Sequence, residues 1–414
     1  QFNMSATRSS GTYTQLNTRV LGNLKTIRDY AAVNEEWGTY LAATVLRAFT
    51  YQVLVDCYEQ VPYTEAMNTA YPSPKYDDGL TVYQGVIAEI DDALAKASES
   101  DLVCNNFLFP SAGAQEWVRF ANALKLKMYM RISGVADVQS AVDALVAEGN
   151  FPTSDVAWMG CWTDEGGKAN PYFSEEFGSY TSVQKNVSLN LALQGTMSSY
   201  NDARLAAFFD PSSNGNYTGA ISGTNFSVSA SDHGAGYWCR PAVRFNSPVY
   251  LITVSEVEFF LAEYYAKKDP SKAEAHYKAA VDASFASAGV TGADAVYGSG
   301  AAYAWDASAY KEVIGVQKWV ALSGTNNFEA WCELRRLGYP AFSGQKGDDF
   351  YNVQSGDYDA TTYIPGTLYT PITVNAILGA GKVLQRFPFA DSSSSRNENV
   401  PEYKGDGAPM FWVK

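Results

Sequence analysis

The sequence predicts a mainly α protein in which pairs of helices stack into a superhelix and a loop-rich lobe contains few short strands. Two stretches, roughly 15–150 and 250–340, carry apolar residues with the period of an α-helix. Two others, roughly 151–248 and 341–414, are rich in Gly, Ser, Asn and aromatic residues and are expected to form the lobe. We therefore expect a single unit over residues 1–414, in which a helical portion supports an irregular lobe.

Four helices are predicted in the first part of the chain. They cover residues 37–60, 80–97, 115–133 and 135–148. Apolar residues recur along them at helical spacing, which gives each helix a side that faces a core. Pro62 ends the first helix because proline disfavours helical backbone in the residue before it. Gly149 ends the fourth, as is common at helix C-termini.

Further helices are predicted in the second half of the chain. They cover residues 189–209, 255–267, 272–287, 310–322 and 328–337. Asn326 and Glu329 have the spacing of an N-terminal cap for the last helix, and Gly338 ends it. We expect the last two helices to form a hairpin with a tryptophan packed between them. Arg335 or Arg336 is expected to hold carboxylates or a carbonyl there.

The helix pair at 255–287 carries a repeat signature. Tyr264, Ala273, Tyr277 and Ala280 are spaced 9, 4 and 3 residues apart, like the matching positions of a tetratricopeptide repeat. Small side chains on the second helix allow the first helix to approach closely, and aromatic rings fill the gaps between pairs. The predicted fold class is therefore a tetratricopeptide-like αα-superhelix with a loop-rich lobe.

Composition and charge exclude several classes of function. The net charge is −14 and no basic run is longer than Arg335–Arg336, so the chain lacks the clustered cations that bind nucleic acid. No stretch approaches the roughly 20 apolar residues of a membrane span. The first residues contain no apolar segment, so we expect that any signal peptide was removed or never existed.

The cysteines do not predict a metal site. All five are widely spaced and form no C-x-x-C motif. Cys57 and Cys332 lie in apolar helical patterns and are expected to be buried. Cys161 and Cys239 each neighbour a tryptophan in loop-like sequence, and the sequence does not decide whether they form a disulfide. A calcium loop of the twelve-residue type is also absent. We predict neither a metal nor a cofactor.

Residues with a catalytic pattern are not found. The two histidines, His233 and His276, have no serine or cysteine partner signature. The adjacent acids Asp77–Asp78, Glu175–Glu176 and Asp348–Asp349 are expected to point apart and to be solvated. We predict no catalytic residue. Sequence spacing does not exclude two carboxylates at the roughly 5–10 Å separation of a glycoside hydrolase, so an α-helical hydrolase stays an alternative.

Aromatic residues in the loops predict a binding surface for sugars. A sugar ring has an apolar face that packs on a flat aromatic ring, and its hydroxyls bond to polar side chains. The loops 71–78, 158–180 and 237–240 concentrate such groups. The predicted ligand-binding residues are Tyr71, Tyr76, Trp158, Trp162, Tyr172, Tyr237, Trp238 and Arg240. The alternative for each ring is packing of its loop onto the helices.

Several segments resemble a known family. QKWVALSGTNNFEAWCELRRLGYP, residues 317–340, resembles the C-terminal signature of SusD/RagB-like outer-membrane lipoproteins of Bacteroidota, in the SusD-like branch. LRAFTYQVLVDCYEQVPYTEA resembles a family helix and turn, with Glu59 and Gln60 where Gly-Asp is common. The other matching segments are SPKYDDGLTVYQGVIAEIDDALAKA, RFANALKLKMYMRIS, SEVEFFLAEYYA and RFPFADSSSSRNENVPEY, in the family's order.

The resemblance implies four tetratricopeptide-like helix pairs with a loop-rich ligand lobe. It also implies a non-enzymatic nutrient-binding protein that takes an oligo- or polysaccharide and delivers it to a TonB-dependent, SusC-type transporter. The implied location is the extracellular face of the outer membrane, with a lipid anchor on an N-terminal cysteine that this sequence does not contain. A subunit of the transporter complex without its own ligand site stays a further alternative.

Overall fold

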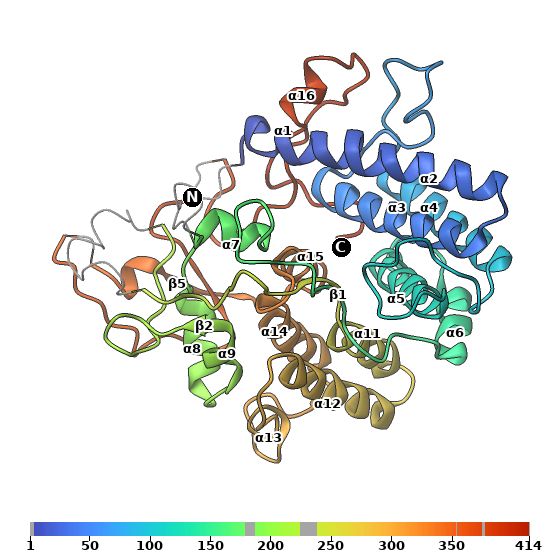
Figure 1. Ribbon diagram of the computed structural model, residues 1–414. Coiled ribbons are helices and arrows are strands. Elements are labelled where there is room, and N and C mark those ends of the chain that lie inside the picture. The colour runs from blue at the N-terminus through green and yellow to red at the C-terminus, as the bar shows by residue number, and fades with distance from the viewer. Residues whose placement is uncertain (1–3, 179–186, 224–237, 353, 375–376, 414) are drawn as a thin grey trace. The chain divides into compact units, whose positions relative to one another are not determined.

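The computed structural model describes residues 4–178, 187–223, 238–352, 354–374 and 377–413 (Figure 1). About 48 % of the chain is helical and the strands are few and short, which confirms the predicted mainly α fold class. The chain divides into two compact units. We call Phe2–Thr153 together with Val383–Lys414 the split unit, and Ser154–Lys382 the continuous unit.

The split unit is built from helices. Its elements are α1 (Ala6–Thr14), the π-helical η1 (Gln15–Leu21), α2 (Gly22–Val33), α3 (Trp37–Tyr58), α4 (Gly79–Lys96), α5 (Gln115–Ile132), α6 (Gln139–Glu148) and α16 (Asp391–Ser394). The helices α3 to α6 confirm the four predicted ones, with ends that differ by a few residues. No helix was predicted at α1, which buries only Ser9 and Tyr13 and therefore has no apolar stripe.

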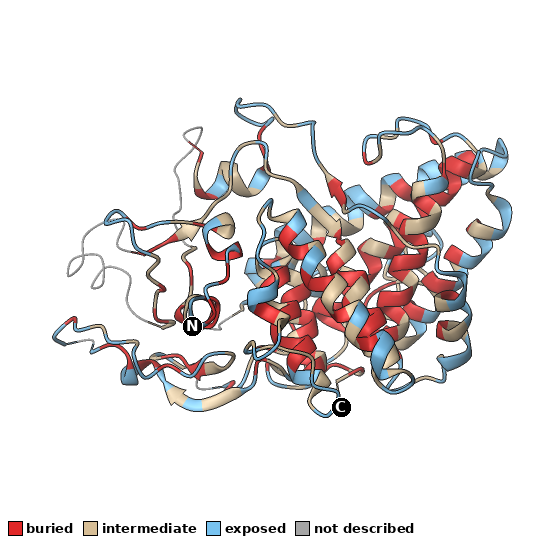
Figure 2. Cartoon of the chain, turned by 90° about the horizontal axis from the view of Figure 1, so that it is seen from below, coloured by how far each residue is buried: buried red, intermediate tan, exposed pale blue. Residues whose placement is uncertain are grey.

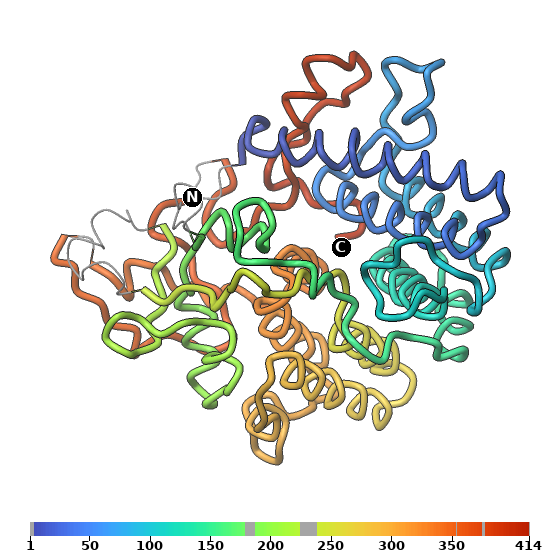
Figure 3. Tube along the Cα trace, viewed as in Figure 1, coloured from blue at the N-terminus to red at the C-terminus, as the bar shows by residue number. Residues whose placement is uncertain are grey.

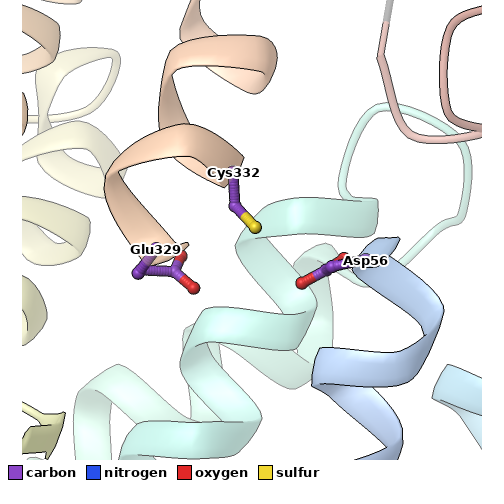
Figure 4. A group of neighbouring side chains, drawn as sticks. All are labelled: Asp56, Glu329 and Cys332. Carbon is purple, nitrogen blue, oxygen red and sulfur yellow. The ribbon is translucent and has the colours of Figure 1, made fainter. Parts of the chain in front are cut away.

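The helix α3 forms the centre of the split unit. It is buried on all sides because α2, α4 and α5 pack against it. Figure 2 shows buried residues concentrated on the helices and exposed residues on the loops. Asp56, near the end of α3, is fully buried (Figure 4). Its carboxylate accepts hydrogen bonds from the Tyr83 hydroxyl at 2.7 Å and the Gln52 amide at 2.5 Å, and it pairs with Arg131. These contacts compensate the buried charge.

The C-terminal tail returns to the split unit, where Figure 3 shows it running among the N-terminal helices. The Phe387 backbone N–H donates to the Cys57 carbonyl at 2.8 Å, so the tail bonds directly to the end of α3. Glu59, the residue directly after α3, has a φ of 67°, a backbone conformation that favours glycine. Its buried carboxylate pairs with Arg386 and, at 2.8 Å, with Lys404. These ion pairs hold glutamate at a position where the resembling family commonly has glycine.

The continuous unit combines helices with short strands. Its elements are β1 (Val156–Trp158), α7 (Pro171–Glu176), α8 (Leu191–Ser199), α9 (Arg204–Phe208), β2 (Phe209–Asp210), β3 (Arg240–Pro241), β4 (Val249–Ile252), α11 (Val254–Ala266), α12 (Pro270–Ser287), α13 (Asp294–Tyr297), α14 (Tyr310–Ser323), α15 (Asn327–Leu337), β5 (Phe342–Lys346), η2 (Gly347–Asp349) and β6 (Leu368–Thr370). Strands β1 and β4 pair antiparallel, as do β2 and β3, whereas β5 and β6 pair parallel. Among the described residues, no helix of the chain is long and apolar enough to cross a membrane.

The single helix predicted at 189–209 is wrong, because the chain turns between α8 and α9. Asn201 has φ of 54°, which interrupts the helix. Asp202 then accepts the backbone N–H of Arg204 at 2.9 Å and pairs with the Arg204 guanidinium at 2.6 Å. Both side chains are fully buried, so this turn is fixed by an internal ion pair.

The pair α11–α12 confirms the repeat signature in its buried positions. Ala273, Tyr277 and Ala280 have no exposed surface. The Ser255 hydroxyl of α11 donates to the Ala280 carbonyl of α12 at 2.7 Å, which shows how closely the helices approach. The fourth position, Tyr264, is half-buried and meets the neighbouring ring of Tyr265 edge-on at 4.9 Å.

The hairpin α14–α15 is confirmed, including its cap. The Asn326 side chain accepts the Glu329 backbone N–H at 3.1 Å, and Gly338 ends α15 with φ of 77°. Arg336 pairs with Glu263 at 2.5 Å and with Glu333 at 2.7 Å, as predicted for an arginine that holds carboxylates.

The side chains of the hairpin differ from the prediction in one respect. Trp319 packs against the cluster formed by α8, α9 and Cys239, outside the hairpin, because its side of α14 faces that cluster. The Arg335 Nε donates to the Trp331 carbonyl at 3.3 Å. Glu329 and Cys332 project from α15 about one turn apart, and both are buried (Figure 4).

Candidate functional site

The short helix α7 is fixed at its start by Asn170. The Asn170 side-chain oxygen accepts the backbone N–H groups of Tyr172 at 2.8 Å and of Phe173 at 3.1 Å. Asn170 is itself buried and anchored: its backbone N–H donates to the Phe245 carbonyl at 2.7 Å, and its Nδ2 to the Ser247 carbonyl at 2.8 Å. These bonds attach α7 to the segment before β4, so the side chains of α7 are held in place.

The aromatic rings of α7 form a cluster with Arg240. Phe173 and Phe177 stack with centroids 6.4 Å apart and 15° between their planes, and Tyr172 meets Phe177 edge-on at 5.9 Å. The guanidinium carbon of Arg240 lies 4.3 Å from the Phe177 centroid. All four side chains are half-buried, so each keeps some exposed surface. We call Tyr172, Phe173, Phe177 and Arg240 the ring cluster.

The charge of Arg240 is balanced within the same region. Its Nη2 donates to the Glu176 carboxylate at 3.2 Å and to the Glu176 carbonyl at 3.1 Å, and its Nε donates to the Val187 carbonyl at 3.4 Å. Burial raises the pKa of Tyr172, the charge of Glu176 raises it further, and Arg240 opposes them by a smaller amount. The Tyr172 phenol is therefore protonated at neutral pH and can donate a hydrogen bond.

Several polar groups of this lobe have no hydrogen-bond partner among the described residues. They include the Tyr172 hydroxyl, the Nη1 of Arg240 and the Nε1 of Trp162. The Trp162 Nε1 is buried, and leaving a buried donor unpaired costs about 1–3 kcal/mol. Flat rings beside free donors match the chemistry of a sugar, which has an apolar face and a rim of hydroxyls.

The structure brings together some of the predicted binding residues of the lobe. Tyr172 and Arg240 both contact Phe177. Trp158 lies on β1 opposite Val249 and is half-buried, as is Trp162 in the loop between β1 and α7. That Trp158 and Trp162 contact a ligand stays a prediction.

One predicted residue of the 237–240 loop leaves the candidate site, and another is not tested. Trp238 is only 6 % exposed and meets Tyr358 edge-on at 5.8 Å, so its ring packs its own loop onto the fold. We therefore remove Trp238 from the binding surface. Tyr237 lies outside the described residues.

Tyr71 and Tyr76 belong to the split unit. Tyr71 is 46 % exposed. Tyr76 is half-buried, its hydroxyl lies 2.5 Å from the Ser393 hydroxyl and 3.3 Å from that of Tyr13, and its ring meets Phe389 edge-on at 5.5 Å. These contacts join the loop before α4 to α16, so Tyr76 has a packing role. A ligand role for Tyr71 stays a prediction.

Sequence reasoning missed Phe177 and the counter-ion Glu176. Phe177 follows two glutamates and was not part of a periodic apolar segment. Its spacing of four residues from Phe173 was the available signal, because residues four apart share one face of a helix. The partner of Arg240 was not visible, since Glu176 and Arg240 are far apart in sequence.

Cys161 and Cys239, whose pairing the sequence left open, form no disulfide: all five cysteines are free. Cys161 is exposed, whereas Cys239 is buried. The Cys239 sulfur accepts the Thr218 backbone N–H at 3.1 Å and donates to the Asn216 carbonyl at 3.3 Å. Burial raises the pKa of the Cys239 thiol, which is therefore an unreactive packing group.

In two of the three adjacent acidic pairs named from the sequence one member is buried, so the expectation that all of them are solvated is wrong. Asp78 is exposed and caps α4 by accepting the Thr81 backbone N–H at 3.0 Å. Asp77 is buried and accepts the Thr64 backbone N–H at 2.8 Å. Glu176 is likewise buried, whereas Glu175 is exposed. The buried members are occupied by structural bonds.

A helical scaffold that holds a fixed group of rings beside free hydrogen-bond donors has the arrangement of a binding protein. The chain belongs to the SusD-like family: the family model described as "Starch-binding associating with outer membrane" matches residues 1–355. This confirms the resemblance seen in the sequence. No sequence among curated proteins matches the chain significantly.

Solved structures show the same fold. A SusD homolog from Bacteroides uniformis has a TM-score of 0.74 at 21 % identity, covering 96 % of this chain and 86 % of that one. A chitin-binding SusD homolog from Flavobacterium johnsoniae has a TM-score of 0.77 at 21 % identity, covering 97 % and 86 %. A SusD-like protein from Bacteroides thetaiotaomicron has a TM-score of 0.75 at 22 % identity, covering 100 % and 88 %. These TM-scores establish a shared fold.

Proposed function

We propose that the chain is a non-enzymatic, cell-surface glycan-binding protein whose ring cluster contacts the sugar. The observation that carries this proposal is the fixed group of half-buried rings beside the free Tyr172 hydroxyl and Arg240 Nη1. The rings supply an apolar face with few rotatable bonds, and the free groups supply bonds to hydroxyls. Family membership supports a glycan as ligand, and so does the chitin-binding homolog of the same fold.

The proposal is tested by titrating the purified chain with a panel of oligosaccharides by calorimetry. The panel includes starch, chitin, xylan, galactan and polyuronate fragments. We expect binding to at least one member, without release of a shorter product. Absence of binding to every member at millimolar concentration would remove the glycan proposal, and product release would favour the hydrolase alternative.

We also propose that the chain works beside a TonB-dependent, SusC-type transporter on the extracellular face of the outer membrane, anchored by a lipid. The family description supports association with the outer membrane. A partner requires a surface, and η1 with α2 offers one. Val20, Ile27, Tyr30 and Val33 are large apolar residues that are 37 %, 43 %, 60 % and 83 % exposed. Such a group of large exposed apolar residues along one helical segment is typical of an interaction surface.

The contact surface gives a prediction for complex formation. Replacing Ile27 by glutamate places a charge on this face, and burying a charge without a partner is strongly unfavourable. We expect about tenfold less transporter to copurify with the tagged Ile27→Glu chain from its own outer membranes. The matched control is Ile364→Glu, since Ile364 is 47 % exposed and lies in the continuous unit. Equal recovery for both variants would contradict this placement of the contact.

A further inference from the structure

We propose that the ring cluster takes uncharged glycans and rejects anionic ones, such as chains with uronic acids or sulfate groups. This inference rests on the proposed function of the ring cluster. Proteins that bind anionic ligands present unpaired Arg or Lys side chains to the carboxylate, phosphate or sulfate group. The lobe around the ring cluster has a different distribution of charge.

Every basic side chain among the described residues of 154–252 is already paired with a carboxylate. The pairs are Lys168–Glu165 at 2.7 Å, Arg204–Asp202 at 2.6 Å, Arg240–Glu176 at 3.2 Å and Arg244–Asp210 at 2.6 Å. An anionic ligand at the ring cluster would therefore meet an arginine whose charge Glu176 already neutralises. A hydroxyl needs only the free Nη1, so an uncharged sugar leaves the ion pair intact.

Carboxylates are also in excess in this segment. The described residues of 154–252 contain seven acidic and four basic side chains. Glu175, on α7 beside the ring cluster, is exposed and has no ion-pair or hydrogen-bond partner among the described residues. Glu176, the neighbour of Glu175 on α7, already neutralises Arg240, so Glu175 adds a negative charge that no cation of the ring cluster balances. A ligand carboxylate placed there is repelled.

The test compares three forms of the tightest-binding neutral oligosaccharide of the panel: the parent, its C6-carboxylate and the corresponding C6-amide. The amide has the shape of the carboxylate without its charge. At low ionic strength we expect the carboxylate to bind roughly three- to tenfold more weakly than the amide. This ratio should fall toward one in 0.5 M salt, because salt screens exposed charges.

The variant Glu175→Gln should reduce the same ratio at low salt without changing the affinity for the parent. The matched control is Glu398→Gln, because Glu398 is also exposed and without a partner among the described residues, but lies in the split unit. The control variant should leave the ratio unchanged. The inference would be overturned if both variants changed the ratio of carboxylate to amide affinity equally. It would also be overturned if neither Glu175→Gln nor salt changed this ratio.

The remaining outcomes separate this inference from the proposed function. A carboxylate that binds as tightly as the amide at low salt overturns the charge selectivity and leaves glycan binding intact. The same holds if the only ligands found in the panel are polyuronates. Absence of binding to all panel members removes the proposed function and the inference together.

Discussion

Replacing Tyr172 by alanine is expected to weaken glycan binding by roughly five- to thirtyfold, or about 1–2 kcal/mol. The change removes a ring that α7 holds in a fixed position against Phe177. It also removes a hydroxyl that has no partner among the described residues. Calorimetric titration with the tightest-binding oligosaccharide measures the effect.

Two further variants separate the contributions of ring and hydroxyl. Tyr172→Phe keeps the ring and should lose about fivefold, because a net hydrogen bond contributes about 1 kcal/mol. Phe107→Ala is the matched control, since Phe107 is 69 % exposed and lies in the split unit, outside every predicted site. Its affinity should equal that of the parent chain. If Tyr172→Ala binds as tightly as Phe107→Ala, the ring cluster does not contact the ligand.

Replacing Arg204 by methionine is expected to lower the free energy of unfolding by about 3–5 kcal/mol, because it leaves the buried Asp202 carboxylate without its counter-ion. Arg204 joins three parts of the continuous unit. Besides Asp202, it donates to the Ser284 hydroxyl of α12 at 3.0 Å and to the Gln317 side-chain oxygen of α14 at 2.9 Å. Urea unfolding followed by circular dichroism measures the loss.

A second arginine–aspartate pair of the same unit is the control. Arg244 and Asp210 are 56 % and 43 % exposed, and an exposed pair contributes at most about 1 kcal/mol. Arg244→Met should therefore have a small effect. The double variant Asp202→Asn with Arg204→Met should recover part of the loss, because it removes the orphaned charge. Equal destabilisation by Arg204→Met and Arg244→Met would show that burial of the pair is not what matters.

Local signals in the sequence predicted most of the helical framework. Periodicity located the helices α3 to α6, α11, α12, α14 and α15, and the cap at Asn326 placed the start of α15 within one residue. The failures have physical causes. The break between α8 and α9 depends on the ion pair of Asp202 and Arg204, whose surroundings come from distant parts of the chain. Helix α1, at the start of the chain, buries only Ser9 and Tyr13 and therefore lacks the apolar stripe that would have predicted it.

The candidate site was less predictable because exposure is a property of the fold. Composition selected Tyr172, Arg240 and Trp238 on equal terms, since each lies in an aromatic loop. The structure leaves Tyr172 and Arg240 half-buried and buries Trp238, whose ring packs against Tyr358. Phe177 and Glu176 complete the ring cluster and its charge balance through contacts with Arg240, a residue distant in sequence.

The most direct test is a crystal structure of the chain with the tightest-binding oligosaccharide of the panel. The ring cluster predicts a sugar ring within about 4 Å of the Tyr172 ring, with a hydroxyl at hydrogen-bond distance, about 3 Å, from Nη1 of Arg240. A sugar bound elsewhere, for example at Tyr71, with Tyr172 and Arg240 free of ligand, would contradict the account.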